Sequence, residues 1–241
     1  MDISLFELVV ALVATLIGAA VQASVGFGFA VVSIPILALV DEQLVPVPQL
    51  LLSFPLALLI LARERAHIDF RDIRWIVVGR VIGGVAAAPL LSVLSGDSLE
   101  LVIGGIVLFT VVTIAAGASI PFRRETQVGA GAVSGATGLI TSMGGPALAL
   151  LYANHAGAKL RSSLAAVFVI GLSINLVIRI FGSAIAVSDV WIGAALLPAL
   201  IVGYVVGARL AWRVDRRGIR TYVLIVSATA SAALIVRALA G

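Results

Sequence analysis

Two glycine-rich stretches interrupt long apolar runs in this sequence, and their residue types are suited to binding an anion. The first stretch contains Gly26 and Gly28, and the second contains Gly144, Gly145 and Pro146. Glycine allows the backbone to break a helix, and proline is favoured in the first turn of the helix that follows. A new helix starts with backbone N–H groups that lack partners and with about half a positive charge. Each break therefore predicts a place where a small anion contacts the backbone.

Further candidate ligands flank the two breaks or lie inside other apolar segments. The candidate substrate-binding residues at the first break are Gln22, Ser24, Gly26, Phe27, Gly28 and Phe29. Those at the second break are Thr141, Ser142, Met143, Gly144, Gly145 and Pro146. Arg80, Asn175 and Arg179 complete the set, because polar groups within a membrane tend to be paired or functional.

Each candidate also has a purely structural interpretation. Glycines allow helices to pack closely, and amides such as those of Gln22 and Asn175 form hydrogen bonds between helices. Arg80 lies six residues past Arg74, within reach of snorkelling to the membrane surface, and Arg179 lies near the end of its segment, where it could serve as an anchor. Two breaks at corresponding places in the chain favour a binding site over packing alone.

The sequence offers little for other kinds of chemistry. It contains no cysteine and only two histidines, His67 and His155, which lie in or beside charged connections. No carboxylate lies in the middle of an apolar segment. The Gly-Phe-Gly stretch is not a dinucleotide-binding motif, since no strand precedes it and position 31 is valine. We therefore expect no metal site, no cofactor, no relay of carboxylates and no enzymatic activity.

The composition is that of an integral membrane protein. Of the 241 residues, 61% are hydrophobic and 12% are charged, and the mean hydropathy is +1.20. Apolar stretches of 18 or more residues recur along the chain, each long enough to cross a hydrocarbon core about 30 Å thick. The pI near 10.3 fits basic cytoplasmic loops better than nucleic-acid binding. The expected partners are the lipid bilayer and a small anion, with a homo-oligomer left open.

Glycine, proline and charge clusters divide the chain into ten apolar segments. They span about 5–22, 27–40, 45–62, 73–94, 98–118, 127–141, 146–158, 160–181, 189–210 and 218–240. The run from Ile3 to Val40 would measure roughly 57 Å as one helix, which is too long for one crossing. It must fold back at Gly26 and Gly28, either as two short crossings or as a re-entrant hairpin.

The ten segments form two sets of five that look duplicated. A shift of 118 to 120 residues aligns Ser24 with Ser142 and brings other breaks into register. We predict an all-α integral membrane protein with a first repeat at 1–120 and a second at 121–241, each with a broken or re-entrant first hairpin. Because each set has an odd number of segments, the second repeat is expected to be inverted in the membrane.

The distribution of basic residues predicts the orientation of the chain. Thirteen of the sixteen Lys and Arg residues fall in four connections, at 63–74, 119–127, 155–162 and 209–220. The alternate connections contain none. The positive-inside rule places the four basic connections in the cytoplasm and the N-terminus of this multi-pass protein outside.

The residues at both breaks resemble the signatures of the TauE/SafE family, also known as sulfite or sulfonate exporters. QASVGFGFAVVSIPIL at 22–37 is similar to the family's first glycine-rich signature, and SGATGLITSMGGPALALLY at 134–152 is similar to the second. The resemblance covers essentially the whole chain. It implies transport of sulfite, sulfoacetate or a related small anion across the bacterial inner membrane. This chain has Thr-Ser-Met before the glycine pair, where many members carry an additional glycine or proline, so the resemblance does not fix the substrate.

Taken together, these features predict a secondary transporter or facilitator that exports a small anion bound between the two broken hairpins. One repeat would move against the other to alternate access. Two other interpretations stay open. One is a scaffold or assembly protein in which the breaks serve only packing, and the other is a transporter of a different small organic anion.

Overall fold

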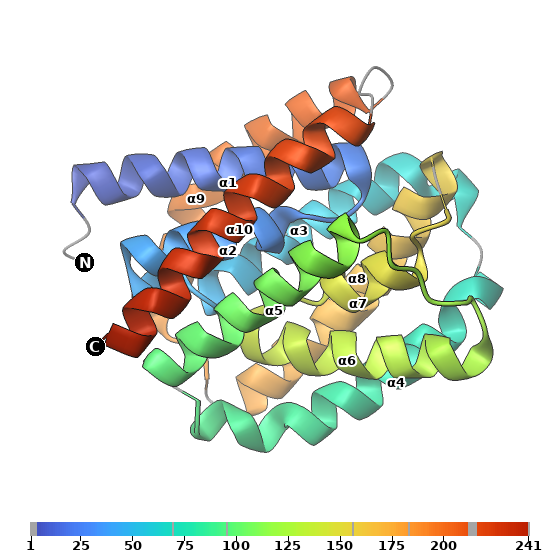
Figure 1. The fold of residues 1–241 in the computed structure, drawn as a ribbon, viewed down its shortest axis with the longest axis horizontal. Helices are drawn as coiled ribbons and strands as arrows, with labels where there is room; N and C mark the ends of the chain where they lie inside the picture. Colours follow the sequence, from blue (N-terminus) through green and yellow to red (C-terminus); the bar gives the residue numbers. More distant parts are fainter. Residues whose placement is uncertain are drawn as a thin grey trace.

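The computed structural model describes residues 4–68, 70–94, 96–155, 157–182, 184–211 and 216–240, with the backbone alone at 71, 72 and 216–224. These residues form ten α-helices joined by short connections, and no strand occurs among them (Figure 1). The helices are α1 (Leu5–Val25), α2 (Phe29–Val40), α3 (Val47–Glu64), α4 (Phe70–Ala87), α5 (Asp97–Ala115), α6 (Arg124–Thr141), α7 (Gly145–Leu151), α8 (Gly157–Phe181), α9 (Val187–Leu210) and α10 (Arg216–Ala240). Much of the basic connection at 209–220 lies outside the described side chains.

Six segments of the described chain are long and apolar enough to cross a membrane. They are Leu5–Val25, Glu42–His67, Ile73–Ser92, Asp97–Ala115, Gly157–Phe181 and Val187–Leu210. Helices satisfy all their backbone hydrogen bonds internally, which is what a hydrocarbon environment requires. The predicted class, an all-α multi-pass membrane protein, is confirmed.

Both predicted breaks are present between helices. α1 ends at Val25 and is capped by Gly26, with φ of 106°, and α2 begins at Phe29 after Gly28, with φ of 124°. Both angles are in the left-handed region, which only glycine adopts without strain. α6 ends at Thr141 and is capped by Ser142, with φ of 61°, and α7 begins at Gly145 with Pro146 in its first turn.

The second helix of each hairpin is short. α2 has 12 residues and α7 has seven, which correspond to about 18 Å and about 10 Å. Neither is long enough to cross a hydrocarbon core of about 30 Å. The predicted segment at 146–158 was too long, because α7 ends at Leu151.

Helices of the first half of the chain pack against helices of the second half. α1 lies along α9, and α4 lies along α6, as Figure 1 shows. α3 also packs on α8, and α5 on α10. A Cβ added at Gly83 would overlap the carbonyl oxygen of Ala132, and one at Gly203 would overlap that of Leu16. Glycine therefore permits the close approach of α4 to α6 and of α9 to α1.

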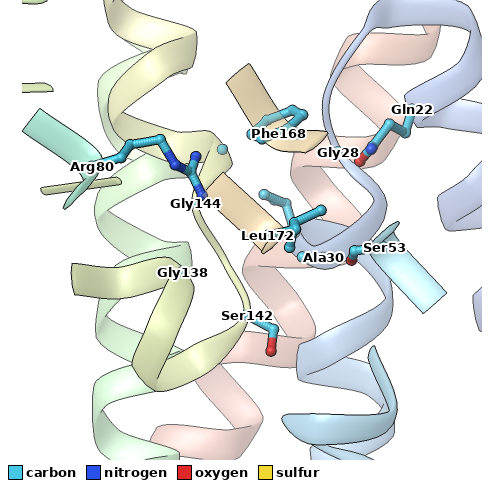
Figure 2. A pocket seen from close by; sticks show the side chains of 12 residues that line it. Gln22, Gly28, Ala30, Ser53, Arg80, Gly138, Ser142, Gly144, Phe168 and Leu172 are labelled. Carbon is cyan, nitrogen blue, oxygen red and sulfur yellow. The ribbon is translucent and has the colours of Figure 1, made fainter. Parts of the chain in front are cut away.

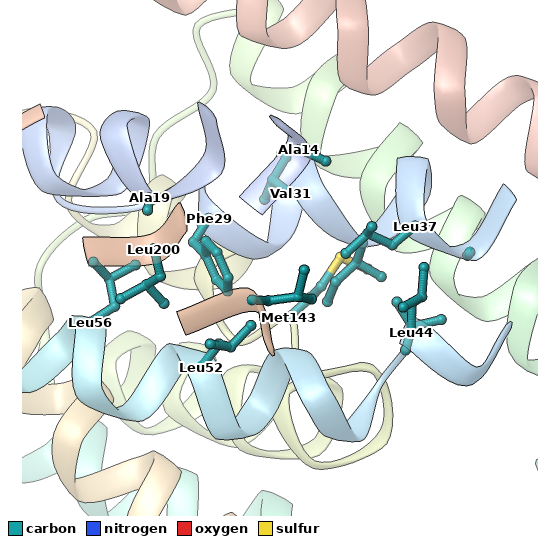
Figure 3. Packing of buried hydrophobic residues seen from close by; sticks show 14 of the residues in the cluster. Ala14, Ala19, Phe29, Val31, Leu37, Leu44, Leu52, Leu56, Met143 and Leu200 are labelled. Atoms are coloured by element: carbon teal, nitrogen blue, oxygen red, sulfur yellow. The ribbon is translucent and has the colours of Figure 1, made fainter. Parts of the chain in front are cut away.

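An apolar core joins the two breaks to the surrounding helices (Figure 3). Phe29 follows the first break and Met143 lies within the second, and both are fully buried in this core. Leu52 of α3 and Leu200 of α9 belong to the same cluster. These two side chains, both candidate substrate-binding residues from the sequence, therefore pack into the core.

Candidate functional site

A small cavity lies between the two breaks. It is lined by Gln22, Gly28, Ala30, Val31, Ser53, Arg80, Gly138, Ser142, Gly144, Gly145, Phe168 and Leu172. Figure 2 shows the first break, with Gln22 and Gly28, across from the second, with Ser142 and Gly144. The cavity has a volume of about 30 Å³, enough for one or two water molecules. The structure thus brings residues more than 100 positions apart around one space.

Arg80 supplies the positive charge of this cavity. Its side chain extends from α4 toward Gly144 (Figure 2) and is only 1% exposed. A Cβ at Gly171 would overlap the guanidinium, and one at Gly144 would lie 3.0 Å from Nη1. The guanidinium centre also lies 5.8 Å from the centre of the Phe168 ring, a cation–π distance. Burial excludes the snorkelling interpretation of Arg80.

The hydrogen bonds of Arg80 leave part of its guanidinium unused. Nη1 donates to Ser134 Oγ at 2.8 Å, and Ser134 Oγ donates to the carbonyl oxygen of Gly144. Nε is buried and has no hydrogen-bond partner. This chain of contacts ties α4 and α6 to the second break and leaves Nε of Arg80 without a partner.

No carboxylate of the described residues forms an ion pair with Arg80. The ion pairs within the described part of the chain join Glu64 to Arg63 and Arg161, and Glu100 to Arg237. A buried charge without a counter-charge is costly in a membrane protein. An anion in the cavity would supply the missing negative charge.

The first break is partly satisfied by the protein itself. Gln22 Oε1 accepts a hydrogen bond from the backbone N–H of Phe29 at 3.1 Å, so the start of α2 has an amide cap. At the second break, Ser142 Oγ donates to the carbonyl oxygen of Pro46 at 2.7 Å, which fixes this break to the start of α3. The two breaks differ in one further respect, because the guanidinium of Arg80 lies at the second one and not at the first.

Several predicted residues do not line the cavity. Ser24 Oγ donates to Val21 O within its own helix, and Thr141 Oγ1 does the same to Thr137 O. Gly26 lies close to the Arg161 side chain, so the end of α1 contacts α8 instead. The remaining predicted residues that lie outside the cavity lining are Phe27, Phe29, Met143, Pro146, Asn175 and Arg179.

Asn175 and Arg179 have different surroundings, although both lie on α8. Asn175 is 1% exposed, its Nδ2 has no hydrogen-bond partner, and Nδ2 lies 3.1 Å from where a Cβ of Gly138 would be. Because Gly138 lines the cavity, Asn175 lies directly behind its wall. Arg179 is 4% exposed and donates to the carbonyl oxygens of Leu139 and Ile140, which neutralises the C-terminal end of α6. Arg179 is thus held by protein rather than placed at a membrane boundary.

Six lining residues were missed by sequence reasoning. They are Ala30, Val31, Ser53, Gly138, Phe168 and Leu172. Phe168 and Leu172 are four residues apart on α8, and Asn175 follows three residues later on the same helical face. That spacing was a usable signal, because Asn175 had already been selected.

The site offers no set of metal ligands. Among the described residues, no group of three or more histidine, aspartate or glutamate side chains is arranged to hold a metal ion. The polar groups that line the cavity are a guanidinium, an amide, glycine backbone and two serine hydroxyls whose hydrogens are donated to backbone carbonyls. This set can bind an anion by charge and by donated hydrogen bonds.

A comparison with known families identifies the chain. A search of curated proteins and a search of solved structures returned no match. A family model described as "Sulfite exporter TauE/SafE" matches residues 10–234, a span that includes both breaks and every residue of the cavity. This chain therefore belongs to the TauE/SafE sulfite exporter family of membrane transporters.

Proposed function

We propose that this protein is a secondary transporter or facilitator that exports a small anion across the bacterial inner membrane. The anion is sulfite or an organosulfonate such as sulfoacetate, and it binds in the cavity between the two breaks. The observation that carries the proposal is the buried guanidinium of Arg80, which lines this cavity and has no carboxylate partner among the described residues.

The chemistry of the site suits an oxyanion of sulfur. A guanidinium can donate two parallel hydrogen bonds to two oxygens of one anion, which gives both charge and geometry. Gly28, Gly144 and Gly145 let an anion approach the backbone closely. The hydroxyls of Ser142 and Ser53 also line the cavity, but they donate to Pro46 O and Gln49 O. Phe168 and Leu172 form an apolar wall that limits access of water and strengthens the electrostatic attraction.

Binding requires the cavity to widen. About 30 Å³ is too small for an organosulfonate, so the walls must separate when substrate enters. The two walls are formed by different breaks, which is the arrangement found where discontinuous helices alternate access. An inside-negative membrane potential favours efflux of an anion by about 2.3 kcal/mol per charge per 100 mV. Export therefore needs no relay of carboxylates.

Two features support an inverted duplication of the chain. The helix pairs between the halves, α1 with α9 and α6 with α4, are related by the predicted correspondence of the two halves. The C-terminal carbonyls of α1 and α6 are also bonded by corresponding arginines: Arg63 of α3 donates to Ala23 O, and Arg179 of α8 donates to Leu139 O. Each half thus repeats the same contact between its third helix and its first.

The role of Arg80 is tested by sulfite flux in proteoliposomes. We expect Arg80→Gln to lower the initial rate at least tenfold, because it removes the charge at the cavity; a tenfold change corresponds to about 1.4 kcal/mol. Arg80→Lys should have an intermediate rate, since it keeps the charge but loses the planar fork. An unchanged rate for a correctly folded Arg80→Gln protein would remove the site assignment.

A second variant tests the site without changing its charge. A Cβ at Gly145 would lie 3.9 Å from Phe27 Cβ and 4.0 Å from Phe168 Cζ, so Gly145→Ala adds a methyl group to the cavity without a clash. We expect a higher KM for sulfite. Gly193→Ala is the matched control, because its Cβ would lie 3.7 Å from Leu51 Cβ, away from the cavity, and its transport should equal that of the unmodified protein.

A further inference from the structure

A second, larger groove lies on the other side of α7. It has a volume of about 520 Å³, within the range of pockets that bind small ligands. It is lined by Gly105, Ile106, Phe109, Ile120, Thr126, Gly129, Ala130, Val133, Thr137, Pro146, Ala147 and Leu150. None of these residues lines the anion cavity. The groove lies between α5, α6 and α7 and is therefore a separate site.

The lining of the groove is almost entirely apolar. Its only polar side chains are those of Thr126 and Thr137. Thr126 Oγ1 donates to Arg123 O at 2.9 Å, and Thr137 Oγ1 donates to Val133 O and Met143 O, each at 2.9 Å. Because both hydroxyls are engaged with backbone carbonyls, the groove offers little that could bind a sulfite or sulfonate group, and it suits an alkyl chain.

One end of the groove carries exposed positive charge. Arg123 directly precedes α6, where its backbone N–H donates to Oγ1 of the lining residue Thr126 at 3.0 Å and its carbonyl oxygen accepts from the same hydroxyl. Arg123 and the following Arg124 are both exposed. Arg124 is turned away from the groove, because its guanidinium stacks on the Trp75 ring of α4, 3.8 Å from the ring centre, and α4 contributes no residue to the lining.

We propose that the groove binds one acyl chain of an anionic phospholipid, with the phosphate group held by Arg123. Apolar surface along the groove and an exposed cation at one end match the two parts of such a lipid. Basic pockets beside membrane helices commonly bind anionic headgroups on the cytoplasmic side, where this connection is expected to lie. A second copy of the chain fits less well, since a twofold axis along the membrane normal would bring like charges of both copies to the same level.

Native mass spectrometry of the delipidated protein in detergent tests the proposal. The probes are phosphatidylglycerol and phosphatidylcholine with identical acyl chains, so that only the headgroup charge differs. We expect phosphatidylglycerol to bind about fivefold more tightly. Equal binding of both lipids would overturn the role of Arg123, and a wild-type dimer in place of lipid adducts would overturn the proposal by identifying the groove as an interface between copies.

Matched variants separate the headgroup from the acyl chain. Arg123→Gln should weaken phosphatidylglycerol binding about fivefold and leave phosphatidylcholine unchanged. Glu125→Gln, which removes the neighbouring charge of opposite sign, should not weaken it. The same loss in Glu125→Gln as in Arg123→Gln would contradict the proposal, because it would show a general disturbance of this end of α6.

Filling the groove tests the acyl-chain contact. A Cβ at Gly129 or at Gly105 meets no atom within 4 Å, so Phe at either position can enter the groove from opposite walls. Both Gly129→Phe and Gly105→Phe should lower binding of the two lipids several-fold. Val202→Phe, on the exposed surface of α9, is the control and should bind as the unmodified protein does. Undiminished binding in a folded protein with either groove variant would overturn the proposed site.

Discussion

Arg80 can be buried because glycines beside it leave space for its guanidinium. Gly171 of α8 leaves the space that the guanidinium occupies, and Gly138 and Gly144 form further small surfaces beside it. Ser134 then fixes Nη1 by a hydrogen bond of 2.8 Å. The position of the charge is therefore determined by glycines on two other helices as much as by the arginine itself.

Gly171→Ala is expected to displace the guanidinium of Arg80. The new Cβ would overlap Nε and Cζ, so the side chain must move, at a cost of about 1–3 kcal/mol in the free energy of unfolding. Sulfite flux should fall together with stability, which thermal unfolding in detergent measures. Gly84→Ala is the control, because its Cβ would lie 3.6 Å from Asn175 Oδ1, an ordinary contact. Normal flux in Gly171→Ala would contradict the need for this position of Arg80.

The surroundings of Arg80 show what could be predicted at the scale of residues. Arg80 was a candidate from sequence because a charge in an apolar segment is rare. The contributions of Ser134 and Gly171 could not be predicted, since small residues are common in membrane helices and their effect depends on which helices are neighbours. Asn175 lies four residues past Gly171, so one helical face of α8 already contained part of this information.

At the scale of helices, close pairing depends on glycine at the points of contact. α4 approaches α6 at Gly83, and α9 approaches α1 at Gly203. In each case a carbonyl oxygen of the partner helix occupies the space of the missing Cβ. Without a hydrophobic driving force between helices in lipid, such close contacts supply much of the packing energy.

Gly83→Ala and Gly203→Ala should each destabilise the protein. The added methyl would overlap the carbonyl oxygen of Ala132 or of Leu16, so the helix pair must separate. We expect a loss of about 1–3 kcal/mol in the free energy of unfolding for each variant. Gly193→Ala, on the same helix as Gly203, should leave the free energy of unfolding nearly unchanged. Unfolding midpoints equal to that of the control would show that these pairs are not held by close contact.

Helix bounds were predictable where glycine or proline ends an apolar run, and less so elsewhere. The breaks at Gly26 and Ser142 followed from residue types. The end of α7 did not, because apolar residues continue beyond Leu151. There, the rings of Tyr152 and Phe122 pack with centroids 5.2 Å apart, and Ile120 N donates to Leu150 O. This contact with the preceding connection is tertiary and leaves no local pattern in the sequence.

At the scale of the whole molecule, the orientation in the membrane is open to a direct test. The chain has no cysteine, so single cysteines can be introduced without further changes. Glu42 and Ser119 are exposed and lie in connections expected on opposite sides. We expect a membrane-impermeant maleimide to label Glu42→Cys in intact cells and Ser119→Cys only after permeabilisation. Labelling in the reverse pattern would contradict an N-terminus outside the cell.

The pairing of α1 with α9 also constrains how the protein is made. α1 leaves the ribosome first, yet roughly 160 residues separate its end at Val25 from the start of α9 at Val187. At about 5–20 residues per second, translation needs roughly ten to thirty seconds to deliver α9. Throughout that interval the face of α1 that α9 will cover must rest against lipid or the insertion machinery. During biogenesis of this transporter, α1 therefore stays unpaired with α9 until nearly the whole chain has been synthesised.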